Sequence, residues 1–170
     1  MEILDIYDDD GKLTGKTIIR GDKSVSLSEN EHIALSVIFI ENSEGKFLIQ
    51  KTSKEKGGEF SSTGGHVESG ETPLEAIKRE VNEELGIDIT KDNIEEIGYI
   101  VYDMPIRYIY YIKKDIDINK VKLQKEEVDY VNFMNKEEIE ELINNNEMLK
   151  SHGIMFKEML KRKEDKNVRY

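Results

Sequence analysis

The first half of the chain alternates short hydrophobic runs with polar turns. The turn at residues 8–12 contains three aspartates and a glycine, and β-prone segments flank it, at Glu2 to Tyr7 and Leu13 to Ile19. These features predict an N-terminal hairpin. The run from Ile33 to Ile40 is hydrophobic at all but one position, as is typical of a strand buried on both faces. We expect this strand at the centre of the sheet, paired with a second strand at Lys46 to Gln50.

A helical pattern replaces the strand pattern at Pro73. Thr72 can cap the first turn, Pro73 suits the first helical position, and Glu75 can return a hydrogen bond to the cap. Gly86 is a typical helix stop, so the sequence predicts a helix that begins at Pro73 and ends just before Gly86, at Leu85. Hydrophobic residues recur every three or four positions along this segment and form one stripe, at Leu74, Ile77, Val81 and Leu85.

The remainder of the chain predicts three longer strands and two helices. A loop rich in lysine, glycine and serine occupies residues 51–65 and ends in a short strand. Later strands are expected at Ile94 to Tyr102, Ile106 to Ile112 and Lys125 to Asn132, and helices after Asn135 and from near Ser151. Residues 161–170 carry mixed charges, from which we expect a frayed tail.

The length and composition indicate one acidic, soluble domain. Residues 1–170 suffice for a single core, with residues 1–30 as a hairpin extension. The net charge of -11 argues against a large nucleic-acid surface or an anionic membrane as partner. The absence of cysteine excludes disulfides and thiol catalysis. No hydrophobic run is long enough to span a bilayer and the N-terminus does not resemble a signal peptide, so we expect a cytoplasmic protein.

Three glutamates on the predicted helix form a candidate metal site. Glu80, Glu83 and Glu84 stand at spacings of three and four residues, so their carboxylates meet on one face and repel one another. Magnesium in proteins is commonly held by a few carboxylates together with water and substrate phosphates. The competing interpretation is a solvated acidic helix face, which is the usual explanation of a glutamate-rich helix.

The residues around these glutamates favour the metal site. The segment fits the pattern G-x5-E-x7-R-E-U-x-E-E-x-G-U, in which U is hydrophobic, at every fixed position. Seven fixed residues at roughly 7% each give a chance match on the order of 10⁻⁸ per starting position. The chain therefore strongly resembles the Nudix family in the residues Gly65, Glu71, Arg79, Glu80, Val81, Glu83, Glu84, Gly86 and Ile87.

This resemblance implies a fold, a reaction and a set of site residues. The implied fold is the α/β class, a Nudix α/β/α sandwich with a mixed central sheet, here with an N-terminal β-hairpin extension. The implied reaction is hydrolysis of a nucleoside diphosphate linked to another group, or of a related small-molecule diphosphate, with Mg²⁺ or Mn²⁺. Glu80, Glu83 and Glu84 would bind metal together with the carbonyl of Gly64 or Gly65. Glu71 and Arg79 would form a structural ion pair.

The water-activating residue and the partners are less closely defined. One of the helix glutamates, or a downstream one, would orient or deprotonate water. Glu126 and Glu127 stand where many members carry one more metal-binding or catalytic glutamate, and simple exposed charge is the equal alternative. We therefore take Glu80, Glu83 and Glu127 as candidate catalytic residues and Glu126 as a candidate metal ligand. Dimers are common in the family, so a homodimer is one expected state, although no residue identifies an interface.

The N-terminal half also resembles one branch of the family, the isopentenyl diphosphate isomerases and their hydrolase-like relatives. His32 and His66 match positions at which the isomerases hold a metal. Those isomerases use a cysteine where this chain has Gly64, and they depart from the glutamate pattern that is intact here. The sequence thus favours a hydrolase, with an isoprenoid diphosphate isomerase or a catalytically weak nucleotide-binding domain as alternatives. The substrate is not readable from the sequence.

Overall fold

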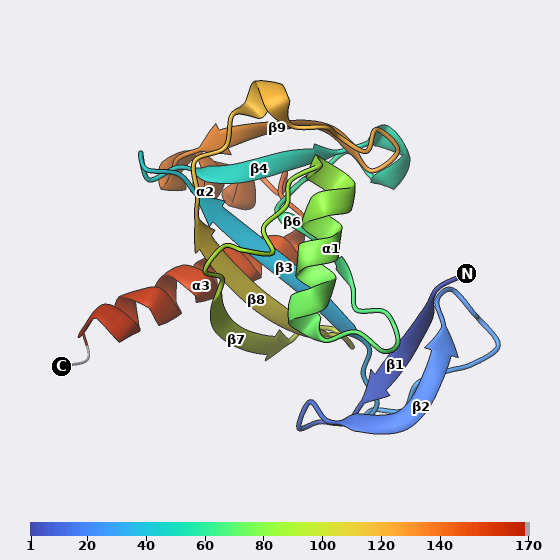
Figure 1. The fold of residues 1–170 in the computed structure, drawn as a ribbon. Helices are drawn as coiled ribbons and strands as arrows, with labels where there is room; N and C mark the ends of the chain where they lie inside the picture. Colours follow the sequence, from blue (N-terminus) through green and yellow to red (C-terminus); the bar gives the residue numbers. More distant parts are fainter. Residues whose placement is uncertain (169–170) are drawn as a thin grey trace.

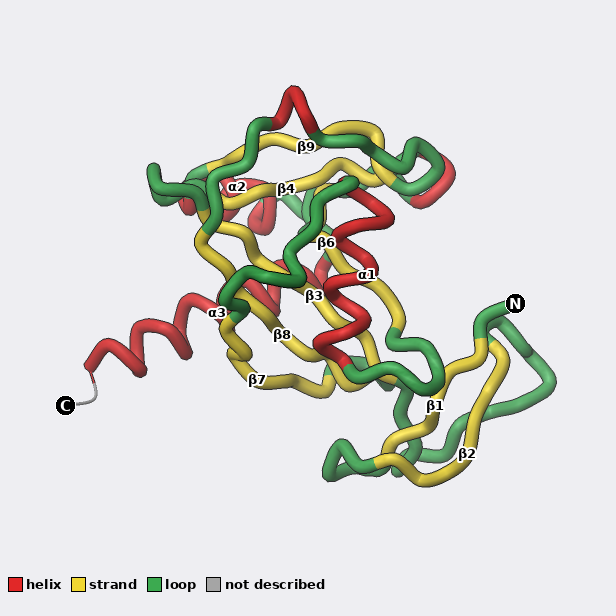
Figure 2. Tube along the Cα trace, viewed as in Figure 1, coloured by secondary structure: helices red, strands yellow, loops and turns green. Residues whose placement is uncertain are grey.

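The computed structural model describes residues 1–168 and arranges them as a mixed sheet between helices, with a separate hairpin beside it (Figures 1 and 2). Short 3₁₀ turns occupy Lys54–Lys56 and Ile118–Lys120. The strands are β1 (Ile3–Tyr7), β2 (Leu13–Ile19), β3 (Ala34–Glu41), β4 (Phe47–Thr52), β5 (Phe60–Ser61), β6 (Thr63–His66), β7 (Glu95–Val101), β8 (Ile106–Lys113) and β9 (Val128–Met134). The helices are α1 (Pro73–Leu85), α2 (Lys136–Asn144) and α3 (Lys150–Val168).

Strand β3 is the centre of the sheet, as its continuous hydrophobic run predicts. It pairs in parallel with β8 along its whole length, from Ala34 beside Ile106 to Glu41 beside Lys113. Its other neighbours, β6 and β4, run antiparallel to it, and β4 also pairs with β5 and β9. The sheet is therefore mixed, which confirms the predicted fold class.

Each face of the sheet is covered by helices, because both faces of β3 are hydrophobic. Alternate residues of a strand point to opposite faces, so Ile38 and Ile40 pack toward α1 whereas Val37 and Phe39 pack toward α2 and α3. Figure 1 shows α1 on one side of β3 and β8 and α3 on the other. The α1 side buries Ile77, Val81 and Leu85, and the α3 side buries Ile139, Leu142, Met155, Phe156 and Met159.

The predicted N-terminal hairpin is present and is attached to the domain body at two places. Tyr7 and His32 exchange backbone hydrogen bonds, at 2.7 and 2.9 Å. The carboxylate of Asp5 accepts hydrogen bonds from the Ser69 hydroxyl and the Gly70 amide, at 2.7 and 3.1 Å. The second attachment joins β1 to the turn that precedes α1.

The C-terminal segment differs from its expected form. Helix α3 continues to Val168, whereas a frayed tail was predicted for residues 161–170. Lys163 and Lys166 both form ion pairs with Glu95 of β7, at 2.9 and 3.2 Å, and Arg162 pairs with Glu158 one turn earlier. The two contacts with the distant Glu95 and the local pair within the helix stabilise a segment that the mixed charges alone do not predict to be helical. Residues 169–170 lie outside the described part of the chain.

None of the helices described in residues 1–168 is long and apolar enough to cross a membrane.

We expect Phe156→Ala to lower the free energy of unfolding by about 3–5 kcal/mol, because it removes a fully buried ring from the core. The Phe156 ring packs edge-on against Phe39 and Phe47, at centroid distances of 5.5 and 5.1 Å. Urea unfolding of the two proteins measures the difference. Ile154→Ala on the same helix is the matched control, because Ile154 is exposed. Equal losses in the two variants would contradict the assigned packing.

We expect the contact between His32 and Asp9 to stabilise the fold less as the pH rises. His32 Nε2 lies 2.7 Å from Asp9 Oδ1, and this contact raises the pKa of His32 above its ordinary value of 6.5. A raised histidine pKa contributes stability that is complete below the unfolded-state pKa and disappears as the pH passes the folded-state pKa. Asp9→Asn should therefore lower the free energy of unfolding more at pH 6 than at pH 9. Asp10→Asn, at a neighbouring exposed position, is the control. A loss that is equal at both pH values would contradict the charged contact.

Candidate active site

Helix α1 starts where its cap requires and thereby sets the position of its acidic residues. The Thr72 hydroxyl accepts a hydrogen bond from the Glu75 amide at 3.1 Å, and the Glu75 carboxylate accepts one from the Thr72 amide at 3.3 Å. Gly86 ends the helix with a φ of 66°, a left-handed conformation that favours glycine. Between these ends, the hydrophobic stripe faces the sheet. Glu80, Glu83 and Glu84 consequently lie along the edge next to β6.

Strand β6 lies unusually close to both β3 and α1 because two of its residues have no side chain. A Cβ atom at Gly64 would collide with the carbonyl oxygen of Ser36 on β3. A Cβ atom at Gly65 would overlap the carboxylate of Glu80 on α1. The Glu80 carboxylate therefore occupies the space that a side chain at Gly65 would fill, which brings it against the β6 backbone.

The three helix glutamates are not equivalent. The Glu80 side chain is 15% exposed and that of Glu83 is 49% exposed. Glu84 is 7% exposed, and its Oε2 atom is buried without a hydrogen-bond partner. Glu80 and Glu84 thus point inward toward β6, whereas Glu83 lies at the rim. The spacing of the three residues predicted their proximity but not this difference in burial.

Arg79 connects the helix to the loop before it. Its guanidinium donates two hydrogen bonds to the Glu71 carboxylate, at 2.6 and 3.1 Å, so the ion pair implied by the family resemblance is present. The same group donates to the backbone carbonyl of His66 at 3.0 Å. It also donates to Glu80 at 2.8 Å and to Glu83 at 3.2 Å. One arginine therefore partly neutralises two of the candidate metal ligands.

These residues line a small polar cavity of about 170 Å³. Three of its lining residues were not among the sequence candidates: Glu2 and Arg20 come from the hairpin, and Gln124 comes from the segment before β9. No local motif marks these three positions, because only the folded arrangement brings them to the helix. The lining residues are Glu2, Arg20, Gly64, Gly65, His66, Glu80, Glu83, Glu84, Gln124 and Glu127.

Burial raises the pKa of both inward carboxyl groups. The pKa of Glu84 rises to about 8, chiefly through loss of water and then through the nearby charges of Glu80 and Glu127. The pKa of Glu80 rises to about 7 for the same first reason, although the charge of Arg79 opposes the shift. The two carboxylates are therefore costly to ionise together unless a proton or a cation compensates them.

The two downstream candidates, Glu126 and Glu127, lie in different surroundings. Glu127 lines the cavity, and its carboxylate lies 3.4 Å from Lys56 Nζ. Glu126 lies outside it, in a different surface depression together with Lys54 and Lys125. Of the two histidines that match metal-holding positions of the isomerases, His66 lines the cavity, whereas His32 does not line it and contacts Asp9 and the carbonyl oxygen of Met104.

The cavity suits a divalent cation by its chemistry. Five of its lining residues are glutamates, whose carboxylates are hard oxygen ligands of the kind that magnesium prefers, and Arg20, His66 and Gln124 lie beside them. The unpaired Oε2 of Glu84 leaves one oxygen free to bind a cation, and the raised pKa values of Glu80 and Glu84 mean that a cation or a proton would offset the cost of their charges. Within residues 1–168 no group of three histidine, aspartate or glutamate side chains is already arranged to hold a metal. The bonds from Arg79 to Glu80 and Glu83 account for this, because they direct these carboxylates toward the guanidinium.

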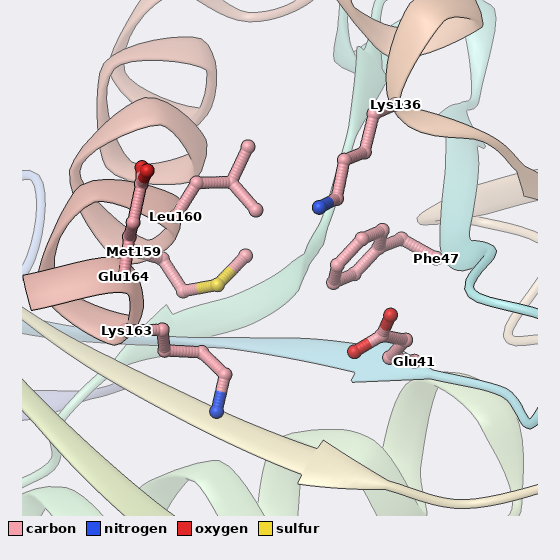
Figure 3. A pocket seen from close by; sticks show the side chains of 7 residues that line it. All are labelled: Glu41, Phe47, Lys136, Met159, Leu160, Lys163 and Glu164. Atoms are coloured by element: carbon pink, nitrogen blue, oxygen red, sulfur yellow. The ribbon is translucent and has the colours of Figure 1, made fainter. Parts of the chain in front are cut away.

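A larger cavity of about 470 Å³ lies at the carboxyl end of β3, where α3 passes over the sheet (Figure 3). Two of its polar groups already have partners in the protein: Glu41 accepts a hydrogen bond from Tyr111, and Lys163 pairs with Glu95. It contains no converging carboxylates, so the smaller acidic cavity is the better candidate for chemistry. Figure 3 labels the lining residues Glu41, Phe47, Lys136, Met159, Leu160, Lys163 and Glu164.

Comparison with curated proteins finds relatives that are named as hydrolases or diphosphatases. An uncharacterized Nudix hydrolase of Listeria monocytogenes is 42% identical over 93 residues, which cover 51% of this chain and 52% of that protein. The 8-oxo-dGTP diphosphatase of Proteus vulgaris is 41% identical over 61 residues, which cover 35% of this chain and 54% of that protein. The chain thus spans about half the length of these relatives.

Comparison with solved structures supports the fold. A Deinococcus radiodurans protein superposes with a TM-score of 0.73 at 22% identity, covering 86% of this chain and 91% of its own. The NUDIX domain of Shewanella oneidensis NrtR, complexed with ADP ribose, superposes with a TM-score of 0.64 at 12% identity, covering 84% and 94%. At these identities the likeness concerns the fold alone. The sequence also matches the NUDIX domain family over residues 30–155, so the chain belongs to that family.

Proposed function

We propose that this protein is a Mg²⁺-dependent hydrolase that cleaves the diphosphate linkage of a nucleoside diphosphate derivative or a related small molecule. The observation that carries the proposal is the pair of buried carboxylates, Glu80 and Glu84, held against the side-chain-free backbone of Gly64 and Gly65. Glu84 has an oxygen with no partner in the protein, which supports binding of a cation at this position. Mn²⁺ fits the same oxygen donors.

In this proposal each residue of the cavity has a distinct role. Glu80, Glu83 and Glu84 hold the metal, with the carbonyl of Gly64 or Gly65 as a further ligand. Glu127 is the group best placed to accept a proton from water, because it lines the cavity without contacting Arg79. Arg79 positions Glu80 and Glu83 and braces the loop through Glu71. A bound divalent cation neutralises diphosphate charge and lowers the pKa of bound water.

Several observations support a hydrolase over an isomerase. The relatives in the family carry the name Nudix hydrolase, and one is a diphosphatase. The chain lacks the cysteine of the isomerases that its N-terminal half resembles, and a side chain at Gly64 would collide with the backbone of β3. The local packing at this position therefore leaves no room for the thiol. The N-terminal half therefore resembles the isomerases in sequence, but the activity that we propose is hydrolysis.

The proposed substrate is a soluble small molecule. A structural neighbour in the family binds ADP ribose, which supports a nucleotide ligand here. The acidic cavity would repel a phosphate chain unless metal ions compensate its charge. The acidic, cysteine-free composition supports a cytoplasmic setting.

We expect Glu83→Gln and Glu84→Gln each to lower turnover by about tenfold or more, because each removes a charged metal ligand. A panel of nucleoside diphosphate derivatives assayed with Mg²⁺, following release of monophosphate, identifies the substrate and measures the loss. Glu140→Gln, on the exposed side of α2, is the control. Near-normal metal-dependent activity in both variants would remove these residues from the site. Tight nucleotide binding without metal-stimulated turnover in the unmodified protein would support a binding domain instead.

We expect Glu127→Gln to reduce turnover more strongly than Glu126→Gln, because only Glu127 lines the acidic cavity. A general base typically contributes 10²- to 10⁴-fold to the rate, on the order of the loss expected here. The same substrate and Mg²⁺ concentration serve for both variants. A greater loss in Glu126→Gln would assign the downstream role to the other glutamate.

A further inference from the structure

Arg107 lies on the face of the sheet opposite α1, in a row that leads to the acidic cavity. On β8 its side chain alternates with Ile106 and Tyr108 and so shares the α3 face with Ile109. Across the sheet it is level with Leu35 of β3, which is level with His66 of β6. Two strand spacings, about 10 Å, separate the backbones of Arg107 and His66.

The guanidinium of Arg107 has unusually few partners for a half-buried cation. Its Nε donates one long hydrogen bond of 3.3 Å to the carbonyl oxygen of Tyr102, and its centre lies 5.5 Å from the Tyr102 ring. No carboxylate in residues 1–168 approaches it within ion-pair distance, although Asp103 is near enough to influence its pKa. Loss of water lowers that pKa, but arginine stays charged. Most of its donors therefore remain available in an otherwise acidic protein.

An uncharged histidine of α3 also lies near this arginine. Burial lowers the pKa of His152 to about 4, and the charge of Arg107 contributes to the shift. His152 Nδ1 accepts a hydrogen bond from the Ser62 amide at 3.1 Å. His66 lines the acidic cavity and so connects it to the region around Arg107. The α3 face thus has a cation and neutral polar groups, whereas the cavity has carboxylates.

We propose that Arg107 binds a phosphoryl group of the substrate that lies outside the hydrolysed diphosphate, on the α3 face beyond His66. The inference rests on the proposed function, because it takes the diphosphate to lie in the acidic cavity. A guanidinium with free donors matches the geometry of phosphate oxygens and forms paired, charge-assisted hydrogen bonds with them. An ion without a partner in a half-buried position is costly, and this ligand would supply the missing charge. Such a group comes either from a phosphorylated sugar or from a longer polyphosphate chain.

Equilibrium binding of three adenosine ligands tests the proposal without any need for turnover. The 5′-monophosphate, the 2′,5′-bisphosphate and the 5′-triphosphate are compared by calorimetry with Mg²⁺ present, so that the metal compensates the charge of the acidic cavity. The measurements use the Glu127→Gln background, in which we expect hydrolysis to be slow. We expect the protein to bind one of the two more highly phosphorylated ligands at least about tenfold more tightly than the monophosphate, the gain typical of a charged hydrogen bond. Preference for the bisphosphate would identify a sugar phosphate, and preference for the triphosphate would identify a polyphosphate chain. Equal affinity for all three would overturn the proposal.

Variants assign the preference to Arg107. Arg107→Met should abolish it, and Arg107→Lys should keep part of it, because lysine retains the charge but not the paired donors. Arg162→Met is the matched control: this arginine also lies on the α3 side, but it is already bonded to Glu158 and to the Tyr99 carbonyl. A preference that persists in Arg107→Met, or is equally lost in folded Arg162→Met, would overturn the assignment. Thermal unfolding verifies that each variant is folded.

The binding experiment tests the role of Arg107, and the hydrolysis assay tests the proposed function, so a negative result in one does not decide the other. Loss of the phosphate preference in Arg107→Met, together with normal Mg²⁺-dependent hydrolysis of a substrate without the extra phosphate, would support the inference. Absence of hydrolysis in the unmodified protein would refute the proposed function. Phosphate binding by Arg107 would still be measurable in that case.

Discussion

The site depends on the close approach of β6 to both the central strand and the helix that carries the glutamates. This approach is a steric condition, because neither Gly64 nor Gly65 has space for a Cβ atom. If β6 were displaced to accommodate side chains, Glu80 would no longer lie against its backbone and Glu84 would lose part of its cover. The hydrophobic stripe of α1 and the parallel pairing of β3 with β8 fix the two walls between which β6 lies. The packing of the whole α1 side of the core thus determines the shape of the cavity.

The second constraint is electrostatic. The Arg79 guanidinium contacts two of the helix carboxylates. It divides its donors among Glu71, Glu80, Glu83 and the backbone carbonyl of His66. Glu84 receives none of these bonds and is the most deeply buried of the three helix glutamates. Arg79 therefore holds the loop through Glu71 and also orients two candidate metal ligands, Glu80 and Glu83, so a change in one contact would affect the other. A cation entering the cavity would compete with Arg79 for Glu80 and Glu83, whereas at Glu84 it would meet an oxygen, Oε2, that has no hydrogen-bond partner.

The sequence predicted what depends on local spacing. The cap at Thr72, the stripe of α1 and the glutamates at intervals of three and four residues all follow from helix periodicity, and the central position of β3 follows from its unbroken hydrophobic run. It could not distinguish Glu126 from Glu127, because these residues lie in a hydrogen-bonded turn before β9 and not in the strand expected from Lys125 onward. The geometry of that turn decides which carboxylate faces the cavity. The helix at residues 161–168 was missed because its partner, Glu95, lies on a distant strand.

The contribution of the N-terminal hairpin to the cavity could not be predicted from local sequence patterns. Residues 1–29 lie outside the segment that matches the family, yet Glu2 and Arg20 form part of the cavity wall. Three contacts set their position: the bridge between Tyr7 and His32, the bonds from Asp5 to the turn before α1, and the ion pair between Glu2 and Arg20 at 2.9 Å. The turn that receives Asp5 also contains Glu71, the partner of Arg79. A shift of the hairpin would therefore change the cavity in two ways. It would move one wall, and it would move the loop whose Glu71 holds Arg79 against Glu80 and Glu83. The hairpin and the family domain therefore form this cavity together.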